Sequence, residues 1–349
     1  MSEENKKLTP IWIAHVDGKR LDTEHEGALI HIVVSDCLNG IGSCTFTFDD
    51  SAVELLDKKI LQAGSNVTLQ LGYKDDCGEV FKGQISAIRV QREEYGHKQL
   101  VVTCKNALYQ LRHGRHMRSF SEKNASDIIG DIIDTYGLKS EIDTFGATNR
   151  FTAESGIDDY RFILELAHTY GKDVYAYGDT IYVKDTIAVH NDEIVYEEGK
   201  SLSRFSLEEN IESVIAKADY VGWDMLKGES FNGSVSVSDV SMTVGGESAW
   251  NETVSVGNNW ISFFADDGLV DAEDAKARAA AEVQNKSFGF ITGTGSGEGN
   301  YKLLPGMHLT IKYVGAPFEG EYVADSVMHS FDYTNGYTTS FSVKRNMTS

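Results

Sequence analysis

The sequence predicts an α+β, mainly β fold. We expect two similar β-barrel modules, a small helix-plus-hairpin α+β domain between them, and an insertion in the second module. The main observation is a repeat: residues 64–71 and residues 306–313 share a glycine followed by a strand-like run. Further along each copy, Phe81-Lys82-Gly83-Gln84 matches Phe318-Glu319-Gly320-Glu321. Because the matches occur in the same order, they indicate one β module used twice.

The ends of the two copies and the stretch between them support the same reading. Each copy closes on a basic residue and an asparagine, at Lys105-Asn106 and at Arg345-Asn346. Between the copies the hydrophobic pattern changes from strand-like to helical. We therefore expect a first β-barrel domain at residues 1–110, a small α+β domain at 111–200, and a second β-barrel domain at 201–349 with an inserted β/helix region at 230–290.

The composition is that of a folded acidic protein. The 349 residues are 41% hydrophobic and 10% aromatic, and the formal net charge is −21. This balance argues against stable nucleic-acid binding, because phosphate contacts need clustered Lys and Arg. No apolar run reaches membrane-spanning length, so we expect no membrane insertion. The polar start, residues 1–7, predicts synthesis in the cytoplasm without a signal peptide.

The cysteines and histidines predict no metal site and no cofactor. Cys37, Cys44, Cys77 and Cys104 share no ligand spacing, so free thiols are expected, with one disulfide among them left open. The scattered histidines, His168, His308 and His329, are expected to be structural.

The first module should contain several short strands. Residues 28–34 form a buried-type strand, and the alternation at residues 44–48 places Cys44, Phe46 and Phe48 on one face. A short helical piece is expected at residues 51–60 and a turn at residues 74–78.

The middle domain should contain two capped helices and a hairpin. Asn124 caps the first helix, which Gly137 ends, and the second starts near Asp158 and stops at Gly171. Strands at residues 174–177 and 180–184 follow.

The second module should open with a strand at residues 215–224. An irregular β excursion at residues 230–264 and a helix capped by Asp271 then form the insertion. The run Gly293–Gly299 is expected to be a flexible loop, since it lacks the Gly-Lys-Ser/Thr end of a phosphate-binding loop. Asn335-Gly336 predicts a closing hairpin.

Several of these stretches together resemble a known family. The run from Glu154 to Ala167, followed by Tyr170-Gly171, is similar to a motif of phage tail hub proteins of the late control protein D family. That family is related to the VgrG proteins of type VI secretion. Further matching stretches are residues 124–138, Val221-Gly222-Trp223-Asp224 and residues 304–329.

The resemblance implies a structural role in a virion tail or an injection-system baseplate. It implies a homotrimeric hub that adapts a sixfold tail tube to a threefold spike. Its partners would be a separate spike protein, a tail tube or tube-initiator protein, and other baseplate proteins. VgrG proteins continue into a spike, whereas this sequence ends after the second module, which is why the spike is expected to be separate. The acidic balance would then give a negative channel that does not retain passing DNA.

Two groups of side chains are candidates for a partner interface. Arg112, Arg115 and Arg118 form a basic cluster in an otherwise acidic chain, and their alternative is a solvated loop. Trp250 and Trp260 lie in the insertion and could contact a partner or a sugar, or pack internally.

No catalytic residues are assigned, and no enzyme activity is expected. Paired acids such as Asp158-Asp159 and Asp266-Asp267 stand at turns or helix caps, where Asp is favoured locally. The alternative function is a tail-associated cell-wall hydrolase or glycan-binding protein, since glycosidases use two carboxylates.

Overall fold

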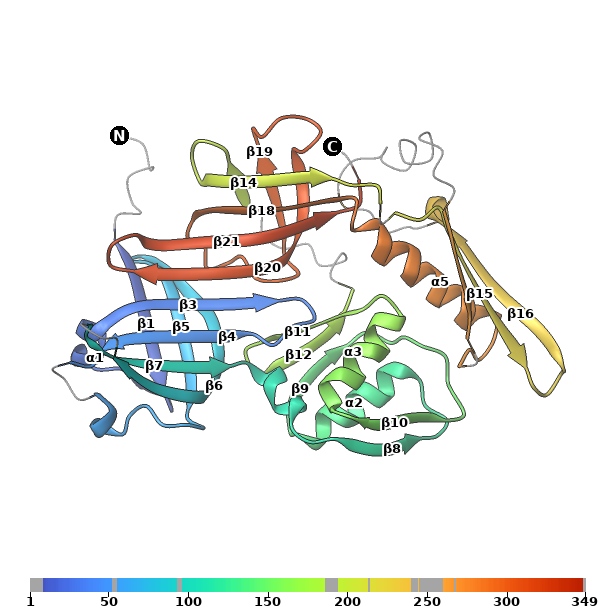
Figure 1. Cartoon of the computed structure of the whole chain (residues 1–349), viewed down its shortest axis with the longest axis horizontal. Coiled ribbons are helices and arrows are strands. Elements are labelled where there is room, and N and C mark those ends of the chain that lie inside the picture. The colour runs from blue at the N-terminus through green and yellow to red at the C-terminus, as the bar shows by residue number, and fades with distance from the viewer. Residues whose placement is uncertain are drawn as a thin grey trace.

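The chain forms one long sheet with smaller units attached to it (Figure 1). The structure is a computed structural model that describes residues 9–51, 55–92, 96–185, 194–212, 214–239, 244, 260–266 and 268–347. Within these residues thirteen strands belong to the long sheet, and smaller sheets and helices are attached to it. The predicted α+β, mainly β class is confirmed.

The described part of the first module contains seven strands and two short helical turns. Its strands are β1 (Pro10–Val16), β2 (Lys19–Arg20), β3 (Leu29–Cys37), β4 (Ser43–Asp49), β5 (Asn66–Tyr73), β6 (Asp76–Arg92) and β7 (Lys98–Lys105). They are ordered β2-β1-β5-β6-β7-β4-β3. The helical turns are α1 (Thr23–Ala28) and η2 (Leu55–Lys58). Cys44, Phe46 and Phe48 are all buried, as their alternation predicts.

The second module repeats this strand order. Its strands are β13 (Val195–Glu197), β14 (Leu202–Glu209), β18 (Ile291–Glu298), β19 (His308–Lys312), β20 (Gly320–Asp332) and β21 (Gly336–Arg345). They are ordered β13-β19-β20-β21-β18-β14, which matches β1-β5-β6-β7-β4-β3 position by position. One difference is that β13 runs parallel to β19, whereas β1 is antiparallel to β5.

The two modules share fine detail as well as strand order. Gly64 N–H donates to Ile85 O and Ile85 N–H to Ser65 O; Gly306 N–H donates to Ala324 O and Ala324 N–H to Met307 O. Both glycines have positive φ, 89° and 82°, a conformation that favours glycine. Register shifts also coincide, between Ile85 and Ala87 in β6 and between Ala324 and Ser326 in β20. The duplication predicted from the glycine match is therefore present in the structure.

Two of the sequence matches are out of register, however. Counted from the paired glycines, Leu69 is equivalent to Ile311, and their cross-strand neighbours are Phe81 and Gly320. Phe81 therefore corresponds to Gly320 rather than to Phe318. By the same count Lys105 corresponds to Lys344, so the match of Asn106 with Asn346 is wrong by one residue. The sequence match pairs residues with similar side chains, whereas the backbone hydrogen-bond register shows which residues occupy equivalent positions in the two modules.

The modules are not two separately closed barrels. In the described residues β3 pairs on one edge with β4 of its own module and on the other edge with β20 of the second module. The result is one continuous path, β14-β18-β21-β20-β3-β4-β7-β6, which Figure 1 shows as a stack of horizontal strands. Each module keeps its own apolar core, one centred on Phe46 and Phe48 and the other on Tyr196 and Phe341.

The middle domain follows the prediction closely. Helix α2 (Ala125–Thr135) is capped by Asn124, whose side chain accepts from the Asp127 N–H at 2.8 Å. Helix α3 (Asp159–Thr169) is capped by Asp158. The remaining elements are η3 (Ala107–Arg112), β8 (His116–Phe120), β9 (Lys139–Ile142), β10 (Thr152–Ile157), β11 (Asp173–Tyr177) and β12 (Thr180–Lys184). Strands β11 and β12 form the expected hairpin.

The insertion is a separate small unit. Strand β15 (Lys217–Asp224) pairs with β16 (Glu229–Ser236) and β17 (Ile261–Ala265), and α5 (Ala272–Ser287) and η5 (Val237–Asp239) complete the unit. The expectation that residues 215–224 open the second module is therefore wrong. Periodicity identifies a strand but not its neighbours, and here both neighbours lie in the insertion. Gly233 allows close packing, because a Cβ there would collide with the backbone of α5.

The expected flexible loop at Gly293–Gly299 is also wrong. Residues Ile291–Glu298 form β18, a central strand between β14 and β21. A Cβ at Gly295 would lie 2.5 Å from the Phe341 ring, and a Cβ at Gly297 would overlap the Ser201 carbonyl oxygen. The glycines therefore provide room for large neighbours, a use of glycine that composition alone does not distinguish from flexibility.

Candidate functional site: the polar face of the continuous sheet

The outward side of the continuous sheet is lined by hydroxyl groups. Alternation along each strand sends large apolar side chains into the cores and small polar ones outward. Cross-strand register joins these polar side chains into rows. One row is Ser206, Thr294, Ser342 and Ser326; a second is Ser296, Ser340, Met328, Ser35 and Ser43; a third includes Thr338, Ser330, Val33, Thr45 and Thr103. We call this surface the hydroxyl face.

The hydroxyl face spans both modules, and at the junction between them its rows also contain Cys37, Met328 and Val33. The Oγ atoms of Ser326 and Ser342 lie 2.7 Å apart and share a hydrogen bond. A shallow groove of about 570 Å³ crosses the face, from Arg204 and Ser206 on β14 to Ser35 on β3. Because β3 belongs to the first module and β14 to the second, this groove exists only through the β3–β20 pairing.

The hydroxyl face carries charges of both signs. Its register positions carry the acids Asp49, Glu208, Glu298 and Asp332 and the bases Arg89, Lys105, Arg204 and Lys344. The net charge of −21 therefore arises elsewhere on the protein. A strongly negative channel lining does not follow from the total charge, because alternation distributes acids among faces independently of their number.

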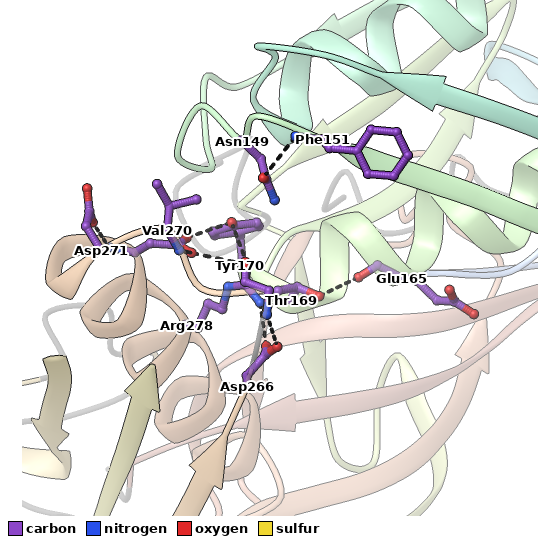
Figure 2. A network of polar contacts seen from close by, with 11 residues as sticks. Asn149, Phe151, Glu165, Thr169, Tyr170, Asp266, Val270, Asp271 and Arg278 are labelled. Carbon is purple, nitrogen blue, oxygen red and sulfur yellow. Dashed lines mark hydrogen bonds and ion pairs between the residues drawn. The ribbon is translucent and has the colours of Figure 1, made fainter. Parts of the chain in front are cut away.

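The insertion is anchored to the middle domain by a buried polar network, which Figure 2 shows. Arg278 contacts Asp266 at 2.7 Å (Figure 2). The Tyr170 hydroxyl donates to Asp274 at 2.7 Å, and Arg278 lies 3.1 Å from the same carboxylate. The Asp274 carboxylate is fully buried, and it also accepts from the Val270 N–H. Burial and the contact with Asp274 help raise the pKa of Tyr170 to about 12, despite the opposing charge of Arg278. The network thus holds α5 against α3.

The far side of the insertion exposes apolar side chains. Trp260 is 47% exposed and Phe263 on β17 is 66% exposed. Trp223, Met225 and Leu226, at the β15–β16 turn, are also exposed. Trp250 lies outside the described residues, so the structure brings only Trp260 of the predicted tryptophan pair into view.

The predicted basic cluster is divided by the fold. Arg112 ends η3 and Arg115 follows in a loop, and both are exposed. Arg118, on β8, instead binds Glu154 at 2.7 Å and Asp159 within the protein. Arg112 and Arg115 therefore remain available for an interface, while Arg118 links β8, β10 and α3.

The Arg118 cluster contains the buried acid pair Glu154 and Asp159. Burial raises the pKa of Glu154, against the lowering effect of Arg118. Burial and a 2.7 Å hydrogen bond to Asp159 raise the pKa of Tyr136 to about 12. The sequence pattern does not reveal this pair, because Glu154 and Asp159 come together only through the arrangement of β10 and α3.

A small cavity lies where the modules meet the middle domain. It measures about 210 Å³ and is lined by Asp36, Asn106, Tyr175, Tyr177 and Met307, among others. Burial raises the pKa of Asp36 to about 7, although the Cys37 N–H donates to it. Within the described residues the buried side chain of Asn106 has no hydrogen-bond partner.

The cysteines and His329 have structural surroundings, whereas His168 is exposed. All four cysteines are free thiols. His329 is buried and contacts Thr339 and the Leu303 carbonyl, and burial lowers its pKa to about 4. In the described residues no cluster of three or more His, Cys, Asp or Glu side chains is arranged to hold a metal ion. No helix in the described segments is long and apolar enough to cross a membrane.

Comparison with known proteins identifies the family of the chain. The family model described as Alg8 N-terminal domain matches residues 8–332. The chain belongs to this family. No curated protein matches it in sequence.

Solved structures show where the fold occurs. A 43 kDa tail protein of prophage MuSo2 from Shewanella oneidensis superposes with a TM-score of 0.70, at 12% identity, over 96% of this chain and 98% of that one. A tail protein from Neisseria meningitidis gives 0.67 at 12% identity, over 97% and 96%. An E. coli component of the type VI secretion system gives 0.61 at 10% identity, over 95% and 76%.

These likenesses establish the fold of this Alg8 N-terminal domain family member. It is the fold of phage tail proteins and of type VI secretion components, so the predicted resemblance to tail hub and VgrG-like proteins is confirmed at that level.

Proposed function

We propose that this protein is a structural hub of a phage tail or related contractile injection system, acting as a homotrimer. The supporting observation is the duplicated module: two units of identical strand order, with coinciding glycine turns and register shifts, lie in one chain. Three such chains present six nearly equivalent modules around one axis. A sixfold tube and a threefold spike can both bind that ring.

The proposed partners follow from this geometry. A tail tube or tube-initiator protein binds one side of the ring, a spike protein binds the other, and further baseplate proteins bind the exposed apolar side of the insertion around Trp260 and Phe263. Arg112 and Arg115 supply a basic contact for an acidic neighbour. Assembly into the virion tail or baseplate is the proposed location.

The hydroxyl face is proposed to line the central channel. Many of its side chains are small and carry hydroxyl groups, and its charges are of both signs over the described strands. Such a lining neither binds a passing anionic polymer, as a basic one would, nor repels it strongly.

A structural role is favoured over a cell-wall hydrolase by the state of the buried acid pair. A hydrolase needs one carboxyl group as acid and another free as base or nucleophile. Here Arg118 contacts both Glu154 and Asp159, and Tyr136 donates to Asp159. We therefore propose that the protein is not an enzyme.

The test is the mass and shape of the purified full-length chain. Multi-angle light scattering is expected to give three times the chain mass, and electron micrographs should show rings with a central channel. A peptidoglycan zymogram is expected to show no clearing. A monomer that clears peptidoglycan would establish the hydrolase instead.

A further inference from the structure

The two modules meet through a strand pairing whose counterpart is left open. In the β3–β20 pairing, seven residue pairs run from Ser326 opposite Cys37 to Asp332 opposite His31. The first-module equivalent of this part of β20 is residues 87–92 of β6, and the second-module equivalent of β3 is β14. Residues 87–92 of β6 pair with β7 on one side, and β14 pairs with β18 on one side. On its other side, neither segment pairs with another described strand.

Residue-by-residue equivalence comes from coinciding irregularities. The register shift in β6 between Ile85 and Ala87 matches that in β20 between Ala324 and Ser326. The register shift in β3 between Leu29 and His31 matches that in β14 between Leu202 and Arg204. These two coinciding shifts fix which residues of β6 and β14 are equivalent to which residues of β20 and β3. The register of the β3–β20 pairing can therefore be applied directly to the two open edges.

The transferred register brings compatible side chains together at three positions, and at two others it places Ile88 opposite Glu209 and Arg92 opposite Phe205. It places Arg89 directly opposite Glu208, Gln91 opposite Ser206, and Val90 opposite Leu207. Arg89 and Glu208 are both exposed in the single chain. Val90, at 45% exposure, and Phe205, at 40%, are apolar side chains on the same open edges. An exposed edge strand carrying apolar side chains is a template for pairing with another chain.

We propose that β14 of one copy pairs antiparallel with residues 87–92 of β6 in a second copy, in this register. The inference rests on the proposed homotrimeric hub and specifies how its copies join. Each chain offers one edge of each kind, so the contact is head-to-tail and can close a ring. Around that ring the intermolecular pairing alternates with β3–β20, and the hydroxyl face continues from copy to copy.

The first experiment is a charge swap read out by sedimentation equilibrium of the full chain. Arg89→Glu and Glu208→Arg alone should each weaken trimer association by about tenfold or more, because like charges then face each other at every contact. The double variant should recover most of the loss. Glu229→Arg, an exposed acid on β16, is the matched control and should assemble like the wild type.

The second experiment traps the register by oxidation. The pair Gln91→Cys and Ser206→Cys should form intermolecular disulfides and give a covalent trimer on a non-reducing gel, while either single variant should not. A trimeric wild type with unaffected charge variants and no cross-link would overturn the pairing and leave the hub intact. A wild type that is monomeric at every concentration would overturn the hub itself, and a ladder beyond three chains would overturn ring closure.

Discussion

Strands β4 and β18 occupy the same place in the two modules but fill it in opposite ways. The inward positions of β4 carry Cys44, Phe46 and Phe48, and those of β18 carry Gly293, Gly295 and Gly297. In the second module the missing volume is supplied from neighbouring strands, by Phe341 and Leu207. The comparison shows that a repeated fold preserves backbone pairing while exchanging which strand provides the large core side chains.

Removing a large core side chain from β4 of the first module should have the largest effect on stability. Phe46→Ala removes a buried ring from a strand whose neighbours cannot refill the space, so we expect a loss of about 3–4 kcal/mol in the free energy of unfolding. Urea denaturation measures it. The same change at exposed Phe151 is the control, and equal losses at both sites would contradict the packing argument.

Enlargement in the second module tests the reverse case. Gly297→Ala places a Cβ against the Ser201 carbonyl oxygen, so we expect a loss of about 2–3 kcal/mol from overpacking. Thermal unfolding measures it, with Gly27→Ala, where a Cβ meets no atom within 4 Å, as the control. A neutral Gly297→Ala would contradict the tight packing of β18 and would favour the flexible loop expected from the sequence.

The insertion is the largest difference between the modules, and Asp274 tests how it is held. Asp274→Asn removes a buried charge beside Arg278 and weakens its contact with Tyr170, so we expect a loss of about 2 kcal/mol. Hydrogen exchange should increase in α5 and little in β4. Glu273→Gln, at an exposed neighbouring position, should leave both unchanged.

The smallest expected effect concerns pH and the strand at the module junction. Burial in the junction cavity raises the pKa of Asp36 to about 7, whereas Glu209, its equivalent on the open edge of β14, is exposed. Between pH 4 and 7 the folded protein keeps a proton that the unfolded chain releases, so stability falls as pH rises through this window.

Asp36→Asn should remove this fall. We expect the variant to gain about 1 kcal/mol over the wild type at pH 8, less than the full pKa difference implies because the side chain is partly solvated. Urea midpoints at pH 5 and pH 8 measure the change. Glu209→Gln should show no gain in stability at pH 8. An equal gain in both variants would contradict the argument that burial at the module junction causes the effect.

Local pattern was sufficient for elements whose signals are local. The caps at Asn124, Asp158 and Asp271, and the turn at Asn335-Gly336, depend on neighbours within a few residues and were predictable. The Arg118 cluster was not predictable, because its carboxylates are 36 and 41 residues away in the chain. Gly293–Gly299 was misread for the same reason: the room its glycines provide is defined by residues in other strands.

The sequence by itself determined the mainly β class, the capped helices of the middle domain and the existence of a duplication, since each is written in short-range periodicity and turn chemistry. The tertiary structure alone decided the register of that duplication, the β3–β20 junction, the hydroxyl face and the two open edges. These depend on which strands hydrogen-bond to each other, and strand pairing between distant segments leaves almost no trace in either segment alone.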